Sequence, residues 1–168
     1  MRAVLVALAL LSLVACGYHL PGRGNQLPED VQRLVIEVLK NKTTEPFIET
    51  RLTSEVRDQF ARRPYFDVVA SEAQADALLQ GEISSYHVRA VAYDRDDEIA
   101  EYRATMTLTA RLVRATRDEI LWQGDVSWSE EFKASDDRAQ QDNNETLAQE
   151  DLSRRLAAEL YNRITDNF

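Results

Sequence analysis

The first sixteen residues constrain this chain most, because they separate an export segment from the part that must fold. Arg2 places a positive charge near the N-terminus, and residues 3–13 form a run of eleven residues without charge. This length falls within the roughly 7–15 residues of a secretory signal and below the roughly 20 residues that span a bilayer. We therefore expect residues 1–15 to be a signal peptide that is cleaved off.

Cys16 is the only cysteine of the chain, and it directly follows Leu13, Val14 and Ala15. This segment resembles the lipobox of bacterial lipoproteins; the alternative is an ordinary signal peptide that happens to precede a cysteine. The resemblance implies an S-diacylglycerol on Cys16, cleavage before it, and an N-acyl chain such as palmitate on the new amino group. Gly17 stands where an aspartate would resemble an inner-membrane retention signal, so the resemblance implies the outer membrane.

The composition of the mature chain favours one acidic domain. Loss of Arg2 with the signal changes the formal charge from −9 to −10, which argues against nucleic acid as a partner. Residues 16–28 contain three glycines and two prolines and are interpreted as a lipidated N-terminal linker. Residues 29–168 have a suitable length for a single domain.

The first part of this domain has a strand–helix–strand pattern. Residues 33–39 are apolar at nearly every position, which is typical of a strand covered on both faces. Pro46 suits the first turn of a helix. Apolar residues then recur at every fourth position on one helical face, namely Ile48, Leu52, Val56 and Phe60. Pro64 ends the helix and residues 65–70 form a second strand, which predicts a parallel pair with a right-handed crossover.

Three further strands are predicted to form two hairpins, with turns at residues 94–98 and 115–118. Residues 77–93 form a long strand whose alternation changes phase near Gly81 or Ser84-Ser85. Residues 102–112 alternate between apolar and polar side chains, as in a half-buried strand. In the strand at 120–132 we expect one buried face, formed by Ile120, Trp122, Val126, Trp128 and Phe132.

The C-terminal part is predicted to be a polar loop followed by a helix. The loop covers residues 134–142, and Asn143 or Asn144 is the expected helix cap. The helix carries an apolar stripe of Leu152, Leu156, Leu160 and Ile164. These elements predict an α/β (α+β) two-layer sandwich. Its mixed sheet has four to five strands with two helices on one face, in the order β-α-β-β-β-β-α.

The sheet face without helices is predicted to be polar. It carries Arg103, Thr105, Thr107, Thr109 and Arg111 on one strand and Gln123, Asp125, Ser127 and Ser129 on the next. A solvated sheet face explains this pattern, and so does a surface that rests against a partner.

Residue patterns of common active sites do not occur in the sequence. His19 lies in the linker and His87 within a strand, and neither has a partner at metal-ligand spacing. There is no nucleophile elbow, zinc-protease motif or phosphate loop. We therefore predict a non-enzyme without catalytic residues, metal or cofactor.

Three segments resemble the LptE family, the lipopolysaccharide-assembly lipoproteins of the Gram-negative outer membrane. They are the opening Cys16–Leu20, the segment Ala100–Tyr102 with its following strand, and Asp142–Glu145 in the C-terminal part. The resemblance implies a lipoprotein on the periplasmic side of the outer membrane that plugs and helps assemble the LptD β-barrel translocon. It also implies a position largely within the barrel lumen and binding of lipopolysaccharide during its insertion into the outer leaflet.

Candidate lipopolysaccharide contacts follow from the same resemblance. Arg95 stands at the basic position that contacts the sugar–phosphate part, and an arginine meets phosphate with two hydrogen bonds. The alternative is a turn arginine that balances the neighbouring acids Asp94, Asp96, Asp97 and Glu98. The second basic position of the family is Gln141 here, so Lys133 or Arg138 would have to replace it.

A different class of function also fits the acidic charge and the polar sheet face. This is a lipid-anchored periplasmic binding module that inhibits an envelope enzyme or serves as an auxiliary subunit of a transporter. A lipoprotein hydrolase, the third class, would need a catalytic cleft.

Overall fold

A mixed sheet of six strands forms one layer of the computed structural model, which describes residues 27, 28 and 30–165. The strand order is β3-β1-β4-β5-β6, with β2 beside β4. The pairs β1–β3, β1–β4 and β2–β4 are parallel, and β4–β5 and β5–β6 are antiparallel. The strands are β1 (Arg33–Ile36), β2 (Lys40–Asn41), β3 (Asp67–Val68), β4 (Ala77–Tyr93), β5 (Ile99–Arg114) and β6 (Ile120–Lys133).

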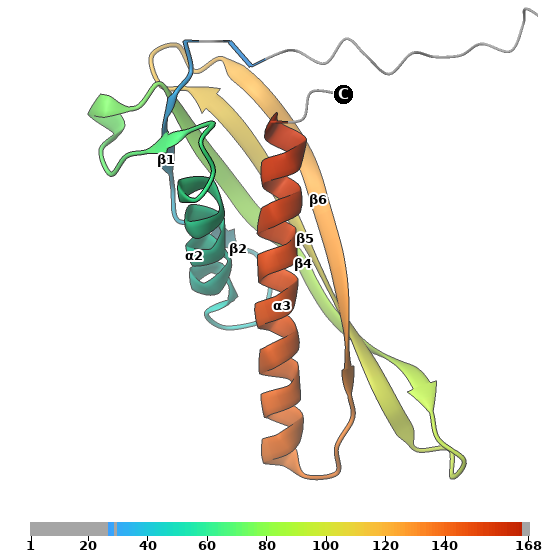
Figure 1. The fold of residues 1–168 in the computed structure, drawn as a ribbon. Helices are drawn as coiled ribbons and strands as arrows, with labels where there is room; N and C mark the ends of the chain where they lie inside the picture. The colour runs from blue at the N-terminus through green and yellow to red at the C-terminus, as the bar shows by residue number, and fades with distance from the viewer. Residues whose placement is uncertain (1–26, 29, 166–168) are drawn as a thin grey trace, which may run out of the picture.

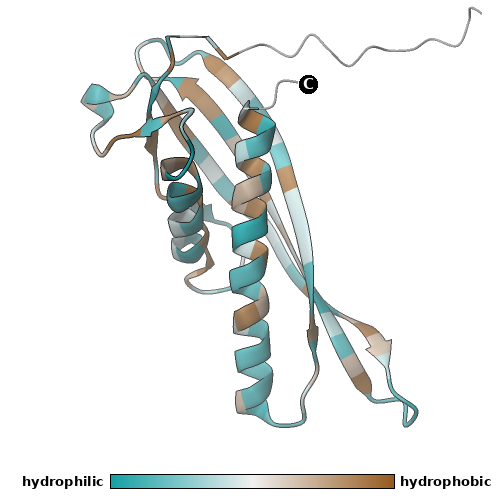
Figure 2. Ribbon diagram, viewed as in Figure 1, coloured by the Kyte–Doolittle hydropathy of each residue, from teal (hydrophilic) through white to brown (hydrophobic). Residues whose placement is uncertain are grey.

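Two helices, α2 (Ile48–Ala61) and α3 (Arg138–Thr165), cover the same face of this sheet (Figure 1). The apolar stripe of each helix is buried, including Leu52, Val56, Leu152 and Leu156 at 0% exposure. Figure 2 shows that the side of α3 turned away from the sheet is largely hydrophilic. The two-layer α+β prediction and the helical stripes are therefore confirmed.

The first two predicted strands are shorter than the sequence indicates. β1 ends at Ile36 because backbone groups at and after this residue form hydrogen bonds with side chains of α2 instead of with a neighbouring strand. Arg57 donates two hydrogen bonds to the Ile36 carbonyl (2.8 and 3.2 Å), and the Leu39 N–H donates to the Thr53 hydroxyl (3.0 Å). The chain then continues as the separate strand β2. Of residues 65–70, only Asp67–Val68 belong to β3, which a short 3₁₀ turn (Glu72–Gln74) follows.

Of the two places where β4 was predicted to be irregular, the second is confirmed, and further register shifts lie between Ala90 and Tyr93. The register to β5 shifts between Ile83 and Ser85, whereas Gly81 pairs regularly with Ala110. A side chain at Gly81 would bring its Cβ to 3.0 Å from both Leu39 Cδ2 and the Thr109 carbonyl oxygen. A larger residue at this position would therefore force Leu39 or the Thr109 backbone to move by a few tenths of an ångström.

The prediction of a polar loop over residues 134–142 is wrong beyond residue 137. α3 begins at Arg138, because Asp137 Oδ1 accepts a hydrogen bond from the Gln140 N–H (2.8 Å) and thereby caps the helix. Asn143 and Asn144 lie inside the helix and do not cap it. The first turns escaped the sequence pattern because polar residues surround the whole helix there.

The predicted buried face of β6 is only partly buried. Val126 and Phe132 lie in the core, but Ile120 is 53% exposed and Trp128 is 36% exposed, while Trp122 is half-buried. β6 is an edge strand, so its residues lack a covering neighbour on one side.

Asp76 joins the N-terminal strand to the start of β4, and its carboxylate contributes to stability. It accepts hydrogen bonds from the backbone N–H groups of Gln32 (3.2 Å) and Arg33 (2.8 Å), and the Arg33 guanidinium lies 2.7 Å away. These bonds with Arg33 hold the pKa of Asp76 well below its ordinary value of 3.8. A lowered pKa means that this contribution is complete above about pH 4 and is lost as the pH falls further.

We expect Asp76→Asn to lower the free energy of unfolding at pH 7 by about 1–3 kcal/mol, since charged hydrogen bonds are lost. Urea denaturation of both proteins between pH 3 and pH 7 measures this difference, which narrows below about pH 4. Asp96→Asn, at an exposed turn position, is the control. A difference that grows on acidification would contradict the assignment.

Candidate functional site

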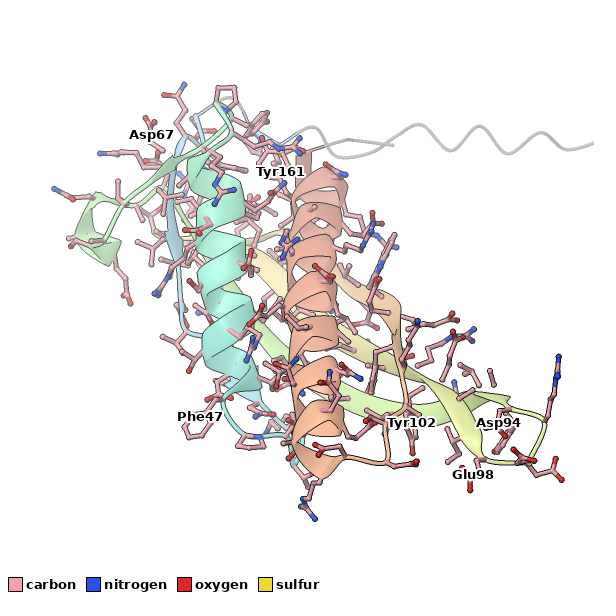
Figure 3. All side chains as sticks on the ribbon, turned by 60° about the horizontal axis from the view of Figure 1, so that its bottom comes forward. Phe47, Asp67, Asp94, Glu98, Tyr102 and Tyr161 are labelled. Carbon is pink, nitrogen blue, oxygen red and sulfur yellow. The ribbon has the colours of Figure 1, made fainter. Side chains whose placement is uncertain are left out.

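The turn between β4 and β5 is closed by the side chain of Asp94. Its Oδ1 accepts hydrogen bonds from the backbone N–H groups of Asp96 (2.9 Å) and Glu98 (3.0 Å). Asp97 adopts a positive φ of 61°, which Asp tolerates better than most residues do. Figure 3 shows Asp94 and Glu98 at the tip of a hairpin that stands apart from both helices. The predicted turn at residues 94–98 is confirmed.

Arg95 is exposed at this tip. Within the described part of the chain, its guanidinium makes no hydrogen bond or ion pair. The Asp94 carboxylate, one of the two acids adjacent in sequence, is engaged with the backbone of the turn. The five donors of the Arg95 guanidinium therefore face solvent, and a phosphate group could accept from them.

Lys133 is the last residue of β6, and its backbone lies opposite that of Glu101 in the β5–β6 register. It lines an open hollow of about 450 Å³ between β6 and the first turns of α3, together with Phe132, Asn144 and Leu147. Neither Arg95 nor Arg138 lines this hollow. The candidate basic residues are thus not gathered in one pocket.

Arg138 is the first residue of α3 and is exposed. Gln141 stands where the family has its second basic residue. Its Oε1 accepts a hydrogen bond from the Ser135 N–H (2.9 Å) and so holds the segment before α3. Figure 1 shows the start of α3 and the β4–β5 hairpin at the same end of the molecule, opposite the end where the chain enters at Leu27. The three basic candidates share this end.

A partly buried polar network that sequence reasoning missed connects α3 to the sheet. The Tyr86 hydroxyl of β4 donates to Glu145 Oε1 (2.9 Å) and accepts from Gln149 Nε2 (3.2 Å), which also donates to Glu45 (2.9 Å). Burial raises the pKa of the Tyr86 hydroxyl above its ordinary value, so it remains a donor. Gln149 lies three residues before Leu152 and therefore on the same helical face as the apolar stripe. This spacing could have indicated from the sequence that Gln149 faces the sheet.

The segment Asp142–Glu145 therefore has a structural role in this chain. Glu145 belongs to the Tyr86 network, and Asn144 Nδ2 donates to the Lys133 carbonyl (2.9 Å), which ties α3 to the end of β6. Tyr102 of the second motif stacks on Phe132 of β6 at a centroid distance of 5.5 Å. Both motifs pack where the hairpin leaves the helical layer (Figure 3).

The uncovered sheet face carries the predicted polar rows, and their side chains bond mainly to one another. Thr105 and Ser129 are joined by their hydroxyls (2.8 Å), and Arg103 Nε donates to Glu131 (3.0 Å). Arg111 donates to Gln80 (2.9 Å) beside an open hollow of about 410 Å³. The hydroxyl rows are half-exposed to exposed, so this face is accessible to a partner.

Several predictions lie partly or wholly outside the described residues. Cys16, His19 and the signal segment 1–15 belong to residues 1–26.

His87 is exposed on β4. Among the described residues, no group of three or more His, Cys, Asp or Glu side chains is placed to hold a metal ion. In the same part of the chain, neither helix is long and apolar enough to cross a membrane.

Solved structures with this fold include several bacterial lipoproteins. The rare lipoprotein B from Shewanella oneidensis is 11% identical with a TM-score of 0.57, over 80% of this chain and 95% of that one. Lipoprotein B from Nitrosomonas europaea is 15% identical with a TM-score of 0.53, over 90% and 94%. The hypothetical protein CT253 from Chlamydia trachomatis is 9% identical with a TM-score of 0.57, over 82% and 99%. At these identities the similarity shows a common fold.

The fold thus defines the class as an α+β domain of the type found in these proteins. A family model described as LptE, lipopolysaccharide-assembly, matches residues 31–164, which is most of the chain, and no curated protein matches. The chain belongs to the LptE family. This is a family of envelope lipoproteins without known enzymatic activity or cofactor, and it acts with LptD and lipopolysaccharide.

Proposed function

We propose that this protein is an outer-membrane lipoprotein that plugs and helps assemble an LptD-type β-barrel and assists lipopolysaccharide insertion into the outer leaflet. The observation that supports this most is the family match, which extends from Val31 to Ile164 and so covers both helices and all six strands. A lipid on Cys16 holds the chain at the periplasmic side of the membrane. The folded domain occupies the barrel lumen.

The open sheet face supports the role of a plug. Its rows of hydroxyl groups, with Thr105, Thr107 and Ser129 at their centre, have no helix over them. The interior wall of a large membrane barrel is polar, so hydroxyl groups meet it without leaving buried donors unpaired. A domain with this surface needs no catalytic cleft to fill a lumen.

Co-purification tests the plug proposal directly. We expect the mature chain with Cys16→Ser, exported by a signal that needs no cysteine for its cleavage and produced together with the barrel, to fold and to co-purify with the barrel at equal stoichiometry. The acyl chains are not part of the core between the helices and the sheet, so their loss leaves the contact surface intact. A folded domain that never co-purifies with the barrel would overturn the plug proposal.

The exposed guanidinium of Arg95 is the proposed contact for lipopolysaccharide phosphate, with Lys133 and Arg138 as further basic contacts at the same end. We expect Arg95→Ala to weaken binding of purified lipopolysaccharide by about 1.5–3 kcal/mol, the range for a hydrogen bond to a charged group. Arg95→Lys recovers only part of this loss, because lysine keeps the charge but not the paired donors. The effect also decreases as salt rises.

Arg117 provides a matched control, because it is an exposed arginine in the other hairpin turn, at the opposite end of the molecule. Arg117→Ala is expected to bind lipopolysaccharide as the parent protein does. Equal affinity of Arg95→Ala and the parent would reject the Arg95 contact, while the plug role would remain.

A further inference from the structure

A basic and aromatic turn follows α2, and the proposed plug function assigns no role to it. We call residues 62–65 the α2 turn; it consists of Arg62, Arg63, Pro64 and Tyr65, and all four are exposed. The Arg62 side chain is 76% exposed, and its nearest acid is Asp58 at 3.4 Å. Tyr65 is 43% exposed although its neighbour Phe66 is buried in the core.

The α2 turn is held in a defined position. The Arg63 guanidinium lies 4.9 Å from the ring centroid of Tyr161 on α3, and the Tyr65 and Phe66 rings meet edge to face at 4.7 Å. Phe66 in turn stacks on Phe60 of α2. The turn therefore presents two guanidinium groups and one phenol ring from a rigid base.

The α2 turn lies at the end of the molecule where the chain enters the fold. β3 begins two residues after Tyr65 and pairs with Arg33 of β1, and the Asp67 N–H bonds to the Gln32 carbonyl (2.9 Å). Figure 1 shows the end of α2 beside the start of the described chain. Ten residues lie between Cys16 and Leu27, so eleven residue steps join them. A chain of that length spans at most about 40 Å, so a lipid on Cys16 keeps this end near the membrane.

The two turns at opposite ends of the molecule differ in charge. The α2 turn contains two arginines and no acid, whereas the turn at residues 94–98 contains four acids and one arginine. The two turns lie at opposite ends, and β4 alone, with 17 residues, spans about 58 Å at about 3.4 Å per residue. An anionic surface therefore attracts the α2 turn more strongly than the turn at residues 94–98.

We propose that the α2 turn rests on the anionic phospholipid headgroups of the membrane that holds the lipid anchor. Arg62 and Arg63 meet the phosphates, and the Tyr65 ring lies at the boundary between headgroups and acyl chains, where an apolar ring with a polar tip is favoured. The tether alone sets only a distance, and this contact sets the orientation of the domain. The inference rests on the proposed lipid anchor at Cys16.

Quenching by brominated lipid tests the contact in the complete lipidated mature protein. The protein is reconstituted into vesicles of phosphatidylethanolamine and phosphatidylglycerol that contain a dibrominated phospholipid, which quenches tryptophan only near contact. Tyr65→Trp is compared with Tyr93→Trp, an exposed tyrosine at the opposite end. Subtracting the emission of the parent removes the contribution of Trp122 and Trp128. We expect the tryptophan at position 65 to lose most of its added emission and the one at position 93 to keep it.

The role of the arginines is tested in the Tyr65→Trp background. Arg62→Glu with Arg63→Glu is expected to abolish most of the quenching, whereas the same charge change at Arg89 and Arg154, two exposed arginines elsewhere, leaves it in place. Equal quenching in both double variants would overturn the phosphate contact.

Two other outcomes are distinguishable by the intact mass of the protein. An acylated chain that stays on the vesicles without quenching at position 65 overturns the membrane contact and leaves the anchor intact. A chain without acyl mass that does not bind vesicles overturns both the anchor and the contact.

Discussion

Replacement of Leu156 by aspartate is expected to unfold the domain. Leu156 is 0% exposed in the core between α3 and the sheet. Truncation of a buried leucine alone costs about 2–5 kcal/mol, and an unpaired carboxylate in the apolar core adds its desolvation. The total loss is therefore comparable with the roughly 5–15 kcal/mol that stabilises a whole domain. Circular dichroism and urea denaturation of the purified protein measure it.

Leu147→Asp is the matched control for this substitution. Leu147 lies on the same helix but is 52% exposed, so an aspartate there remains in water. We expect its free energy of unfolding to stay within about 0.5 kcal/mol of the parent, as is usual at surface positions. If Leu156→Asp were as stable as Leu147→Asp, the buried position of the α3 stripe would be refuted.

The elements that the sequence predicted well are those in which one periodicity extends over a long segment. The stripe from Leu152 to Ile164 and the alternation in residues 102–112 both correspond to buried faces. In these segments every apolar residue points to the same buried face of the helix or strand, so a single exception does not change which face is predicted to be buried. The order of elements followed directly and gave the sandwich.

The elements that were predicted poorly depend on contacts between distant residues. β1 ends where Arg57 and Thr53, more than ten residues later in the chain, take its backbone bonds. Trp128 is an apolar residue in the correct phase, but its exposure follows from the edge position of β6, which no local pattern encodes. The start of α3 was missed because one capping side chain, Asp137, decides it.

The candidate site shows the same division. The turn around Asp94 was predicted, because Asp-rich segments between two strands favour turns. The sequence could not show that Asp94 bonds to its own turn and that Arg95 has no partner among residues 27, 28 and 30–165. It also could not show that Gln141 holds the connection before α3, since a side chain that bonds to a backbone N–H leaves no periodic signal.

Replacement of Cys16 by serine is expected to abolish lipidation and leave an uncleaved precursor. Cys16 lies outside the described residues, so this expectation rests on its place in the lipobox-like segment Leu13–Cys16. A serine hydroxyl is a far weaker nucleophile than a thiolate at neutral pH, so the diacylglycerol transfer that must precede cleavage does not occur.

Asn25→Ser is the control for the anchor, because it places a serine in the same linker without changing the cysteine. Intact mass and incorporation of labelled palmitate distinguish the acylated mature chain from the precursor, and membrane fractionation follows the location of each. We expect the Asn25→Ser chain to be acylated and to fractionate with the outer membrane, and the Cys16→Ser chain to keep residues 1–15 and fractionate with the inner membrane. Normal cleavage of Cys16→Ser together with its retention in the outer membrane would show that another part of the chain supplies the membrane attachment.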